Sequence, residues 1–325
     1  MFDVITVGSA TLDVFAKTEH CDTIKGKKKE DCIAYPIGAK ILIEELIIST
    51  GGGGTNTAAS LSKLGHKVAF LGKIGNQENS QRLLKELKDY KVSPLVIRKK
   101  DSRTGYSVIL DSIHHDRTIL NYRGSNSELG FNEINLRKLK AKWLLFTALR
   151  GKSFRTQEKL AGYAKRKGIK VAYVLNPTIA KKGIKQLKKI LSNVDIIIMN
   201  KEESMLLVGR NTIGKNIRKI RNYGPGIVAV TDGRKGAYVY DGDSIFYGRP
   251  NNVRVIETTG AGDAFASAFL SGIIKKNDVE FALKLGMTNS ESVIQHHGAK
   301  NKLLRYKEAL KIMKKRSIRV TKKAI

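Results

Sequence analysis

The sequence predicts an α/β fold in which helices cover both faces of a mostly parallel central sheet. Apolar strand segments and helical segments alternate from about residue 142 onward, at lengths typical of parallel strands joined by crossover helices. A short apolar strand that ends in glycine, DVITVG at 3–8, opens the chain. Extended segments between about 12 and 48 do not alternate with helices, so they predict a separate, smaller β element.

The first half of the chain predicts more strands than helices. TGYSVILDSIHHDRTILNYRG, at 104–124, is typical of a β-hairpin, because two β-rich runs flank a polar turn at His114–Asp116. The lysine-rich insertion from Lys25 to Asp31 interrupts the first extended region. The other expected elements are strands at 3–8, 39–50 and 67–75, a helix from the glycine run to Gly65, and an amphipathic helix over 80–90.

The second half of the chain repeats strand and helix in turn, and it ends in helices. This order is what a parallel sheet with helical crossovers requires. The expected strands are 142–149, 170–176, 195–200 and 226–233, with a short hairpin at 237–248. The expected helices are 153–167, 181–192, 201–208, 213–223, 261–275, 278–295 and 305–316.

Length and composition favour one main domain over residues 1–325. The chain is 41% hydrophobic, has only five prolines and contains no low-complexity linker. No stretch approaches about 18 uncharged apolar residues, so no membrane span is expected. The first residues lack a basic start followed by an apolar run, so we expect a cytoplasmic protein. Cys21 and Cys32 are expected as free thiols, with a disulfide that closes the lysine-rich loop between them as the alternative.

The net charge of +31 is extreme for a globular enzyme and has three interpretations. It can reflect a general lysine bias of the source proteome, a surface field that gathers anionic nucleotide, or nucleic-acid binding. The basic residues are spread along the whole chain, and no basic-aromatic recognition motif accompanies them. Nucleic acid is therefore not the expected partner.

The most specific motif is ETTGAGDAFASAFLSGII at 257–274, a glycine-rich turn followed at once by an apolar helix. The small residues Gly260, Ala261 and Gly262 leave their N–H groups free to face an anion, with the positive end of the helix dipole behind them. Asp263 lies in the first turn of the same helix. An anion hole beside a carboxylate base suits phosphoryl transfer, although an aspartate is also favoured at any helix N-terminus.

A second glycine-rich turn, STGGGGTNTAASLSKLG, occupies residues 49–65. Its four consecutive glycines before a helix allow the backbone to approach a ligand, or another segment, closely. Asn56 in the first helical turn can both donate and accept hydrogen bonds to a polyol. The turn is not a P-loop, because the Gly-Lys-Ser/Thr ending is absent.

Polar residues also follow two of the expected parallel strands. Asn200 and Glu203 come after DIIIMN, and Thr231 and Gly233 end the next strand. Ligands of open α/β sheets bind at the carboxyl ends of the strands, and amide and carboxylate oxygens can hold hydrated Mg²⁺. The first pair is equally typical of a plain helix N-terminus, and the second of an ordinary turn.

Taken together, these segments resemble the ribokinase/PfkB family of carbohydrate and nucleoside kinases over about residues 3–312. The resemblance is carried by GGGGTN and TTGAGDAF, with Asn176-Pro177, the Asn200 and Thr231 segments and Gly298-Ala299 in the family's order. It implies a ribokinase-like three-layer α/β/α sandwich with a β-sheet lid built from about 12–48 and 96–124. It also implies an ATP- and Mg²⁺-dependent kinase acting on a hydroxymethyl group.

The resemblance implies a role for each matching residue. The acceptor is expected to contact Asp13, Gly52, Gly53 and Asn56, and Mg²⁺ is expected to bind Asn200 and Glu203 through water. The nucleotide is expected to contact Thr231, Gly233, Asn289 and Gly298. Asp263 is the expected base, and the anion hole is expected at Gly260, Ala261 and Gly262.

Three departures from ribokinase proper matter. Thr11 stands where ribokinase has asparagine and Gly53 where it has lysine, and both positions normally help to read ribose. Glu257 replaces the more usual aspartate at a position that contributes to a potassium site in some members, so it is the candidate monovalent-cation ligand.

The resemblance as a whole implies a sugar as the acceptor, with a nucleoside as the alternative. A third interpretation is a nucleic-acid-binding protein on a kinase fold. The family resemblance also implies a homodimer formed through the lid.

Overall fold

A ten-stranded sheet forms the centre of the computed structural model, which describes residues 1–18, 20–27, 31–76, 78–111, 117–316 and 318–324. The order is β18-β17-β16-β15-β14-β13-β12-β1-β6-β8, in which the strands from β15 to β8 are parallel and those from β15 to β18 antiparallel. The predicted α/β class is confirmed. The strands are β1 Phe2–Val7, β6 Val68–Leu71, β8 Ser93–Pro94, β12 Ala141–Thr147, β13 Lys170–Val174, β14 Ile196–Asn200, β15 Ile227–Thr231, β16 Ala237–Tyr240, β17 Ser244–Gly248 and β18 Val320–Ala324.

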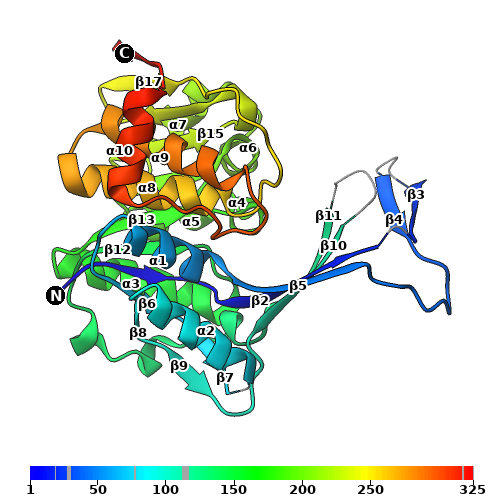
Figure 1. Ribbon diagram of the computed structural model, residues 1–325. Helices are drawn as coiled ribbons and strands as arrows, with labels where there is room; N and C mark the ends of the chain where they lie inside the picture. The colour runs from blue at the N-terminus through cyan, green and yellow to red at the C-terminus, as the bar shows by residue number, and fades with distance from the viewer. Residues whose placement is uncertain (19, 28–30, 77, 112–116, 317, 325) are drawn as a thin grey trace.

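Helices cover the two faces of this sheet as two layers (Figure 1). Successive strand residues point to opposite faces, so Val4 packs in one hydrophobic cluster and Ile5 in the other. One layer contains α3 Gly151–Arg166, α4 Pro177–Ala180, α5 Ile184–Leu191, α6 Lys201–Val208 and α7 Ile213–Arg221. The other contains α1 Gly53–Lys63, α2 Glu78–Asp89, α8 Ala261–Lys276, α9 Val279–Val293 and α10 Tyr306–Lys315.

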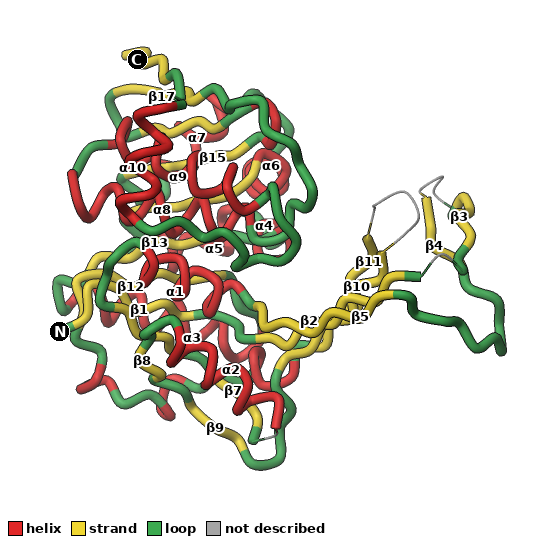
Figure 2. Tube along the Cα trace, in the orientation of Figure 1, coloured by secondary structure: helices red, strands yellow, loops and turns green. Residues whose placement is uncertain are grey.

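A second sheet, which we call the projecting sheet, extends away from the two helical layers (Figures 1 and 2). Its order is β11-β10-β2-β5, with β2 Thr11–Lys17, β5 Glu45–Gly51, β10 Gly105–Asp111 and β11 Arg117–Tyr122. Two further pairs of strands are β3 Asp22–Lys25 with β4 Asp31–Ala34, and β7 Lys73–Gly75 with β9 Ile97–Lys99. This is the separate β element that the extended early segments predicted.

The boundaries of the projecting sheet differ from the expectation in two places. Residues 39–44 were expected to be extended strand but contain none, because the chain pairs with β2 only from Glu45 onward. The segment that begins at 96 was expected in the lid, yet β9 pairs with β7 beside the main sheet. The predicted turn at His114–Asp116 lies outside the described residues.

Most predicted elements of the second half are confirmed, including the helix at 201–208 and the hairpin at 237–248. Two elements were missed. The helix α4 is a single turn, begun by Pro177 and capped by the Asn176 side chain. The strand β18 is polar and mostly exposed, so only its pairing with β17 defines it. No helix among the described residues is long and apolar enough to cross a bilayer.

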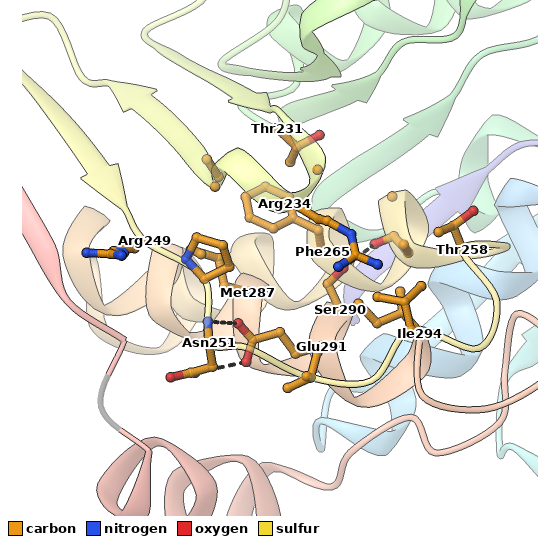
Figure 3. A pocket seen from close by; sticks show the side chains of 18 of the residues that line it. Thr231, Arg234, Arg249, Asn251, Thr258, Phe265, Met287, Ser290, Glu291 and Ile294 are labelled. Carbon is orange, nitrogen blue, oxygen red and sulfur yellow. Dashed lines mark hydrogen bonds between the residues drawn. The ribbon is translucent and has the colours of Figure 1, made fainter.

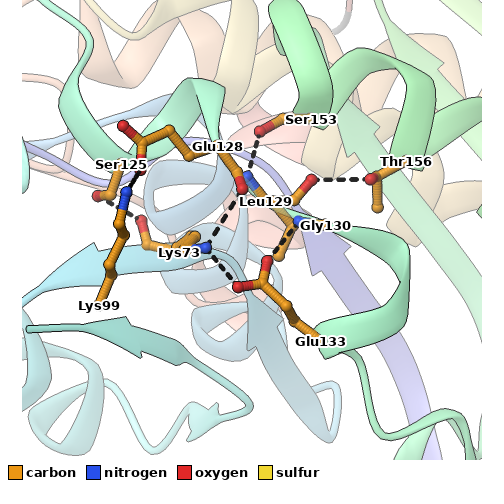
Figure 4. Close-up of polar contacts among 9 residues, drawn as sticks. All are labelled: Lys73, Lys99, Ser125, Glu128, Leu129, Gly130, Glu133, Ser153 and Thr156. Carbon is orange, nitrogen blue, oxygen red and sulfur yellow. Dashed lines mark hydrogen bonds and ion pairs between the residues drawn. The ribbon is translucent and has the colours of Figure 1, made fainter. Parts of the chain in front are cut away.

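A buried lysine joins the irregular segment between β11 and β12 to the body (Figure 4). The Lys73 side chain is 5% exposed, and its Nζ donates to the Glu133 carboxylate and, at 3.3 Å, to the Glu128 carbonyl. The Leu129 N–H donates to Ser153 Oγ at 2.8 Å, while its carbonyl accepts from Thr156 Oγ1 at 2.7 Å. Side chains thus satisfy backbone groups that neither sheet nor helix pairs. The segment contains the short 3₁₀ helices η1 Gly124–Ser127, η2 Phe131–Glu133 and η3 Leu136–Lys138.

The helix α8 is buried on all sides, because every residue from Ala264 to Ile273 is buried. It lies between α1 and α9. Gly272 is the point of closest approach: a Cβ there would lie 2.5 Å from the Ala282 Cα of α9. Since neither backbone can move aside without separating the helices, this contact sets the position of α8 and of the turn that precedes it.

We expect Gly272→Ala to destabilise the protein by about 1–3 kcal/mol through overpacking, although alanine is the better helix former. The matched control is Gly162→Ala in α3, where the nearest atom to a new Cβ is the mobile Arg166 Nη1 at 3.5 Å. That change should be neutral or stabilising by up to about 1 kcal/mol. Urea unfolding of both variants checks the signs; equal effects would contradict the packing argument.

Candidate active site

The carboxyl edge of the parallel strands gathers the polar residues that the sequence singled out. The strand β14 ends at Asn200 and β15 ends at Thr231, while α1 and α8 begin near this edge and contact each other. Two helix N-termini therefore point their unpaired N–H groups and positive dipole ends toward one region. The arrangement suits an anionic ligand, provided that side chains leave space for it.

A hydrogen bond joins the two glycine-rich segments. Asn56 Nδ2 in α1 donates to Asp263 Oδ2 in α8 at 2.9 Å, across 207 residues of sequence. Asn56 is 6% exposed, and its Oδ1 is buried with no partner among the described residues. Burial raises the pKa of the Asp263 carboxyl above its ordinary value, while the Asn56 hydrogen bond and the Lys300 charge lower it. The side chains predicted as base and acceptor contact thus lie together.

The turn before α8 needs glycine at one position and leaves space at another. Gly260 has φ 78°, and a Cβ there would lie 2.6 Å from the Ala299 Cα. Beside Gly262, by contrast, no heavy atom lies within 4 Å of the Cβ position. The Ala261 N–H donates to the Thr258 carbonyl at 3.2 Å, so this amide of the expected anion hole is already engaged. The open N–H groups of the first turn are those of Gly262 and Asp263.

The glycine run at α1 is explained largely by close packing. Gly52 has φ 98°, and a Cβ there would lie 2.5 Å from the Ser9 carbonyl oxygen. A Cβ on Gly53 would lie 2.9 Å from Thr147 Cβ, and one on Gly54 would lie 2.8 Å from the Gly8 backbone. The run therefore lets the first turn of α1 settle on the turn between β1 and β2, which positions Asn56.

Asp13 lies in β2, between β5 and β10 of the projecting sheet. Burial raises its pKa, against the hydrogen bonds of Ser107 and Thr11 and the charge of Lys300. Its Oδ1 is buried and has no partner among the described residues. A buried acceptor without a donor is costly, so this oxygen is suited to a ligand hydroxyl.

Asn200 and Glu203 cap the helix α6 by pairing with each other. Asn200 Oδ1 accepts from the Glu203 N–H, and Glu203 Oε2 accepts from the Asn200 N–H, both at 2.8 Å. Burial raises the pKa of Glu203 to about 7, against the Asn200 hydrogen bond. Both residues line a cavity of about 210 Å³ together with Thr231, Gly262 and Asp263. The capping reading is confirmed, and the same side chains border the candidate base.

A larger cavity of about 490 Å³ adjoins the first and shares Thr231, Gly262 and Phe265 with it. Figure 3 shows Ser290, Glu291 and Ile294 of the α9 region facing Thr231 across this space. Gly233, the other predicted nucleotide contact at this strand end, also lines the larger cavity, and so does Ala261.

Two predicted nucleotide contacts do not line this cavity. Asn289 is fully buried, and its side chain bonds Ser60, the Ala264 carbonyl and the Leu304 N–H inside the helical layer. Gly298 donates its N–H to Glu257 Oε2 at 2.8 Å. Glu257, the candidate cation ligand, thus holds the loop after α9, and His297 Nδ1 lies 3.7 Å from the same oxygen.

Two features of the site had no signal in the sequence. Glu291 accepts the Asn251 backbone N–H at 2.8 Å and its Nδ2 at 3.0 Å, which fastens the segment after β17 over the larger cavity (Figure 3). Lys300 is 9% exposed and reaches toward Asp13 and Asp263 from the loop after α9. In the sequence, only the neighbouring Gly298-Ala299 pair, which is part of the family resemblance, could have indicated Lys300.

Comparison with known proteins identifies relatives of the whole chain. The family model for "pfkB family carbohydrate kinase" matches residues 2–305. An uncharacterized sugar kinase of Archaeoglobus fulgidus is 30% identical over 250 residues, 75% of this chain and 98% of its own length. A cytidine kinase of Thermococcus kodakarensis is 26% identical and covers 82% of this chain and 94% of its own. A ribokinase of Staphylococcus aureus is 27% identical and covers 91% and 94%.

Solved structures show the same fold. Ribokinase of Thermotoga maritima superposes with a TM-score of 0.82 at 23% identity, covering 97% of this chain and all of that one. Arabidopsis thaliana ribokinase, complexed with ribose and ATP, superposes with a TM-score of 0.81 at 21% identity, covering 96% and 99%. With the family model matched over nearly its full length, the chain belongs to the pfkB family of carbohydrate kinases.

Proposed function

We propose that the protein transfers the γ-phosphoryl group of ATP to a hydroxymethyl group of a sugar, with Asp263 as the general base. The observation that carries the proposal is the Asn56–Asp263 hydrogen bond, which holds a partly buried carboxylate at the open N-terminus of α8. Asp263 also borders the smaller cavity, next to the larger one that adjoins Thr231 and Gly233. A base, an anion-binding helix end and space for a nucleotide thus meet at one edge.

In the proposed reaction, the acceptor lies under the projecting sheet and offers its hydroxyls to the unpaired Asp13 Oδ1 and Asn56 Oδ1. Asp263 accepts the proton of the attacking hydroxyl as its oxygen bonds to the γ-phosphorus, and the bond to the bridging oxygen breaks to release ADP. The Gly262 and Asp263 amides donate to the phosphoryl oxygens, on which negative charge accumulates. Gly260 shapes this turn through its contact with Ala299.

The donor set fits Mg²⁺ bound through water. Glu203 is a buried carboxylate whose pKa is raised to about 7, so a nearby cation would favour its ionised form. The oxygens of Glu203 and Asn200 are already used in the helix cap, which favours contact through water over direct ligation. Bound there, Mg²⁺ would neutralise phosphate charge. The carboxylate of Glu257, the candidate monovalent-cation ligand, already accepts the Gly298 N–H.

A nucleoside is the alternative acceptor, since one relative is a cytidine kinase. This reading needs flat apolar side chains near Asp13 to hold a base. Tyr106 in β10 and Tyr122 in β11 line one hollow with Arg103 and Thr104. They lie on the face opposite Asp13, because Tyr106 pairs with both Leu12 and Tyr122, so they do not meet this need. Figures 1 and 2 show that this sheet extends well beyond the body.

The projecting sheet is also the proposed lid and dimer contact. Paired residues of neighbouring strands share a face, so Asp13, Ser49 and Ser107 define the face toward the acceptor. The opposite face exposes large apolar side chains, which are costly to leave in water. They are Leu46 (56%), Ile48 (41%), Leu120 (55%) and Tyr122 (54%).

Asp263→Asn should keep the fold and ATP binding but lower turnover by about 10²–10⁴-fold, the usual range for a lost general base. The measurement is ADP release with Mg·ATP across pentoses, hexoses and nucleosides, with and without potassium. A sugar should give the highest rate with the wild type. Nucleosides alone as acceptors would select the alternative, and near-normal turnover of the variant would remove Asp263 as base.

Leu46→Glu with Ile48→Glu should convert a dimer into a monomer, because the two changes put charge on the outward face of β5. Sedimentation velocity over a concentration series gives the assembly state. Ile47→Glu on the acceptor-side face is the matched control and should remain dimeric. A wild-type protein that is monomeric at every concentration would refute this contact.

A further inference from the structure

A buried lysine outside both glycine-rich segments joins three parts of the active site. Lys300 belongs to the loop between α9 and α10, and its Nζ donates to Thr50 Oγ1 in β5 at 2.6 Å. It also forms an ion pair with Glu86 of α2, to which Thr50 is bonded as well. The loop, the projecting sheet and a body helix therefore meet at one ammonium group.

The charges around Lys300 are mostly negative. Besides Glu86, both Asp13 and Asp263 act on it electrostatically, although burial lowers its pKa. The fold brings these groups together, because Ala299 packs on Gly260 at the start of α8 and Gly51, next to Thr50, packs on the Asp13 carboxylate. Farther out, the Glu257 charge raises the pKa of Asp13, and His297 Nδ1 lies 3.7 Å from Glu257 Oε2. Burial raises the pKa of the nearby Tyr90 hydroxyl, and the Glu86 charge adds to that effect. Lys300 is thus the one buried cation described among these groups.

We propose that Lys300 is a positioning residue whose charge keeps Asp263 in the ionised, proton-accepting form. The inference rests on the proposed role of Asp263. Burial raises the pKa of the Asp263 carboxyl and the Lys300 charge opposes that shift, and a protonated aspartate cannot accept the acceptor's proton. Glu86 and Thr50 hold the amine in place by hydrogen bonds.

The sign of the pH effect follows from this arrangement. A positive neighbour lowers the pKa of Asp263, so removing the charge raises that pKa and moves the acidic limb of kcat/KM to higher pH. Lys300→Gln is the informative change because it keeps an N–H donor for Thr50 and Glu86 while losing the charge. We expect kcat/KM to fall by roughly tenfold more at pH 6 than at pH 9.

The test compares Lys300→Gln with Lys302→Gln, which removes an exposed lysine from the same loop. Two readouts are needed: the pH profile with the best acceptor from the panel, and titration of the Asp263 carboxyl carbon by ¹³C NMR, assigned as the signal missing from Asp263→Asn. Only Lys300→Gln should shift both to higher pH; Glu86→Gln, which removes a nearby negative charge, should not.

The outcomes separate the two proposals. An Asp263 carboxyl that titrates at the same pH in Lys300→Gln and wild type would overturn the inference, even if turnover falls. A shifted carboxyl with an unshifted acidic limb would instead overturn Asp263 as the base.

A separate observation concerns the layer formed by α3, α5 and α7. Residues 159–194 contain no aspartate or glutamate, and neither do residues 204–231. The apolar side chains of these helices pack on the sheet, so their basic residues remain outside. On α5 the exposed residues include Lys185, Lys188 and Lys189. None of these three lysines forms an ion pair within the described part of the chain.

The other helical layer has mixed charge. In α9 Lys284 pairs with Glu280, α10 includes Glu308, and α2 begins at Glu78 and ends at Asp89. Both layers carry many lysines, and the layer of α3 to α7 also contains Glu158 in α3 and Glu202 in α6. What distinguishes α5 and α7 is that their basic residues have no acidic residue on the same helix.

Contrary to the expectation from the sequence, we infer that the α3–α5–α7 layer binds the phosphate backbone of a nucleic acid. Exposed lysines without acidic neighbours create a field that releases counterions from a polyphosphate. A lipid surface is less suited, because α3, α5 and α7 expose no large hydrophobic side chain among the described residues. Tyr163 and Tyr223 are partly buried against the core, so the contact reads backbone charge and not base sequence.

The experiment measures binding of a fluorescent 20-base-pair RNA duplex by anisotropy against salt concentration, with phosphatidylserine vesicles as the second arm. Neutralising Lys185, Lys188 and Lys189 to Gln should weaken RNA binding at least about tenfold and reduce the salt slope by up to about three. The matched control neutralises the exposed Lys311, Lys314 and Lys315 of α10. Equal loss in both variants, or binding to vesicles alone, would overturn the inference.

Discussion

The hydrogen bond from Asn56 to Asp263 is the contact on which the candidate active site depends. It can form only if the first turns of α1 and α8 lie side by side, which the glycines of both segments permit. Gly54 lets α1 approach the turn after β1, and Gly260 lets α8 approach the loop at Ala299. Much of the glycine pattern therefore serves packing, and the open space beside Gly262 is what packing leaves for a ligand.

Carboxylates with raised pKa values and buried oxygens without a described hydrogen-bond donor lie at the same edge of the sheet. Burial raises the pKa values of Asp13, Glu203 and Asp263, while Lys300 is the buried cation that opposes it for Asp13 and Asp263. Asp13 Oδ1 and Asn56 Oδ1 have no hydrogen-bond partner among the described residues, which is costly for buried oxygens. The hydroxyls of a polar acceptor would supply the missing donors.

The two signature segments could be predicted from sequence because their chemistry is local. A glycine turn, a following apolar helix and a carboxylate in its first turn are visible as consecutive residues, and the helix at 201–208 has its caps beside it. Asn289 shows the limit of that approach: its position in the motif order suggested a nucleotide contact, yet it bonds Ser60 and the Ala264 carbonyl inside the layer. The strand β18 was missed because its pairing with β17 alone makes it a strand.

By itself, the sequence determined the alternation of strands and helices, and hence the sheet, the two helical layers and the residues that end each strand. The period of apolar residues and the conformational needs of glycine are local quantities, so they can be read from neighbours along the chain. Tertiary structure alone decided that Asn56 meets Asp263 and that Lys300 enters the site from the loop after α9. Those outcomes depend on distances between residues far apart in sequence, which only the packing of helices on the sheet sets.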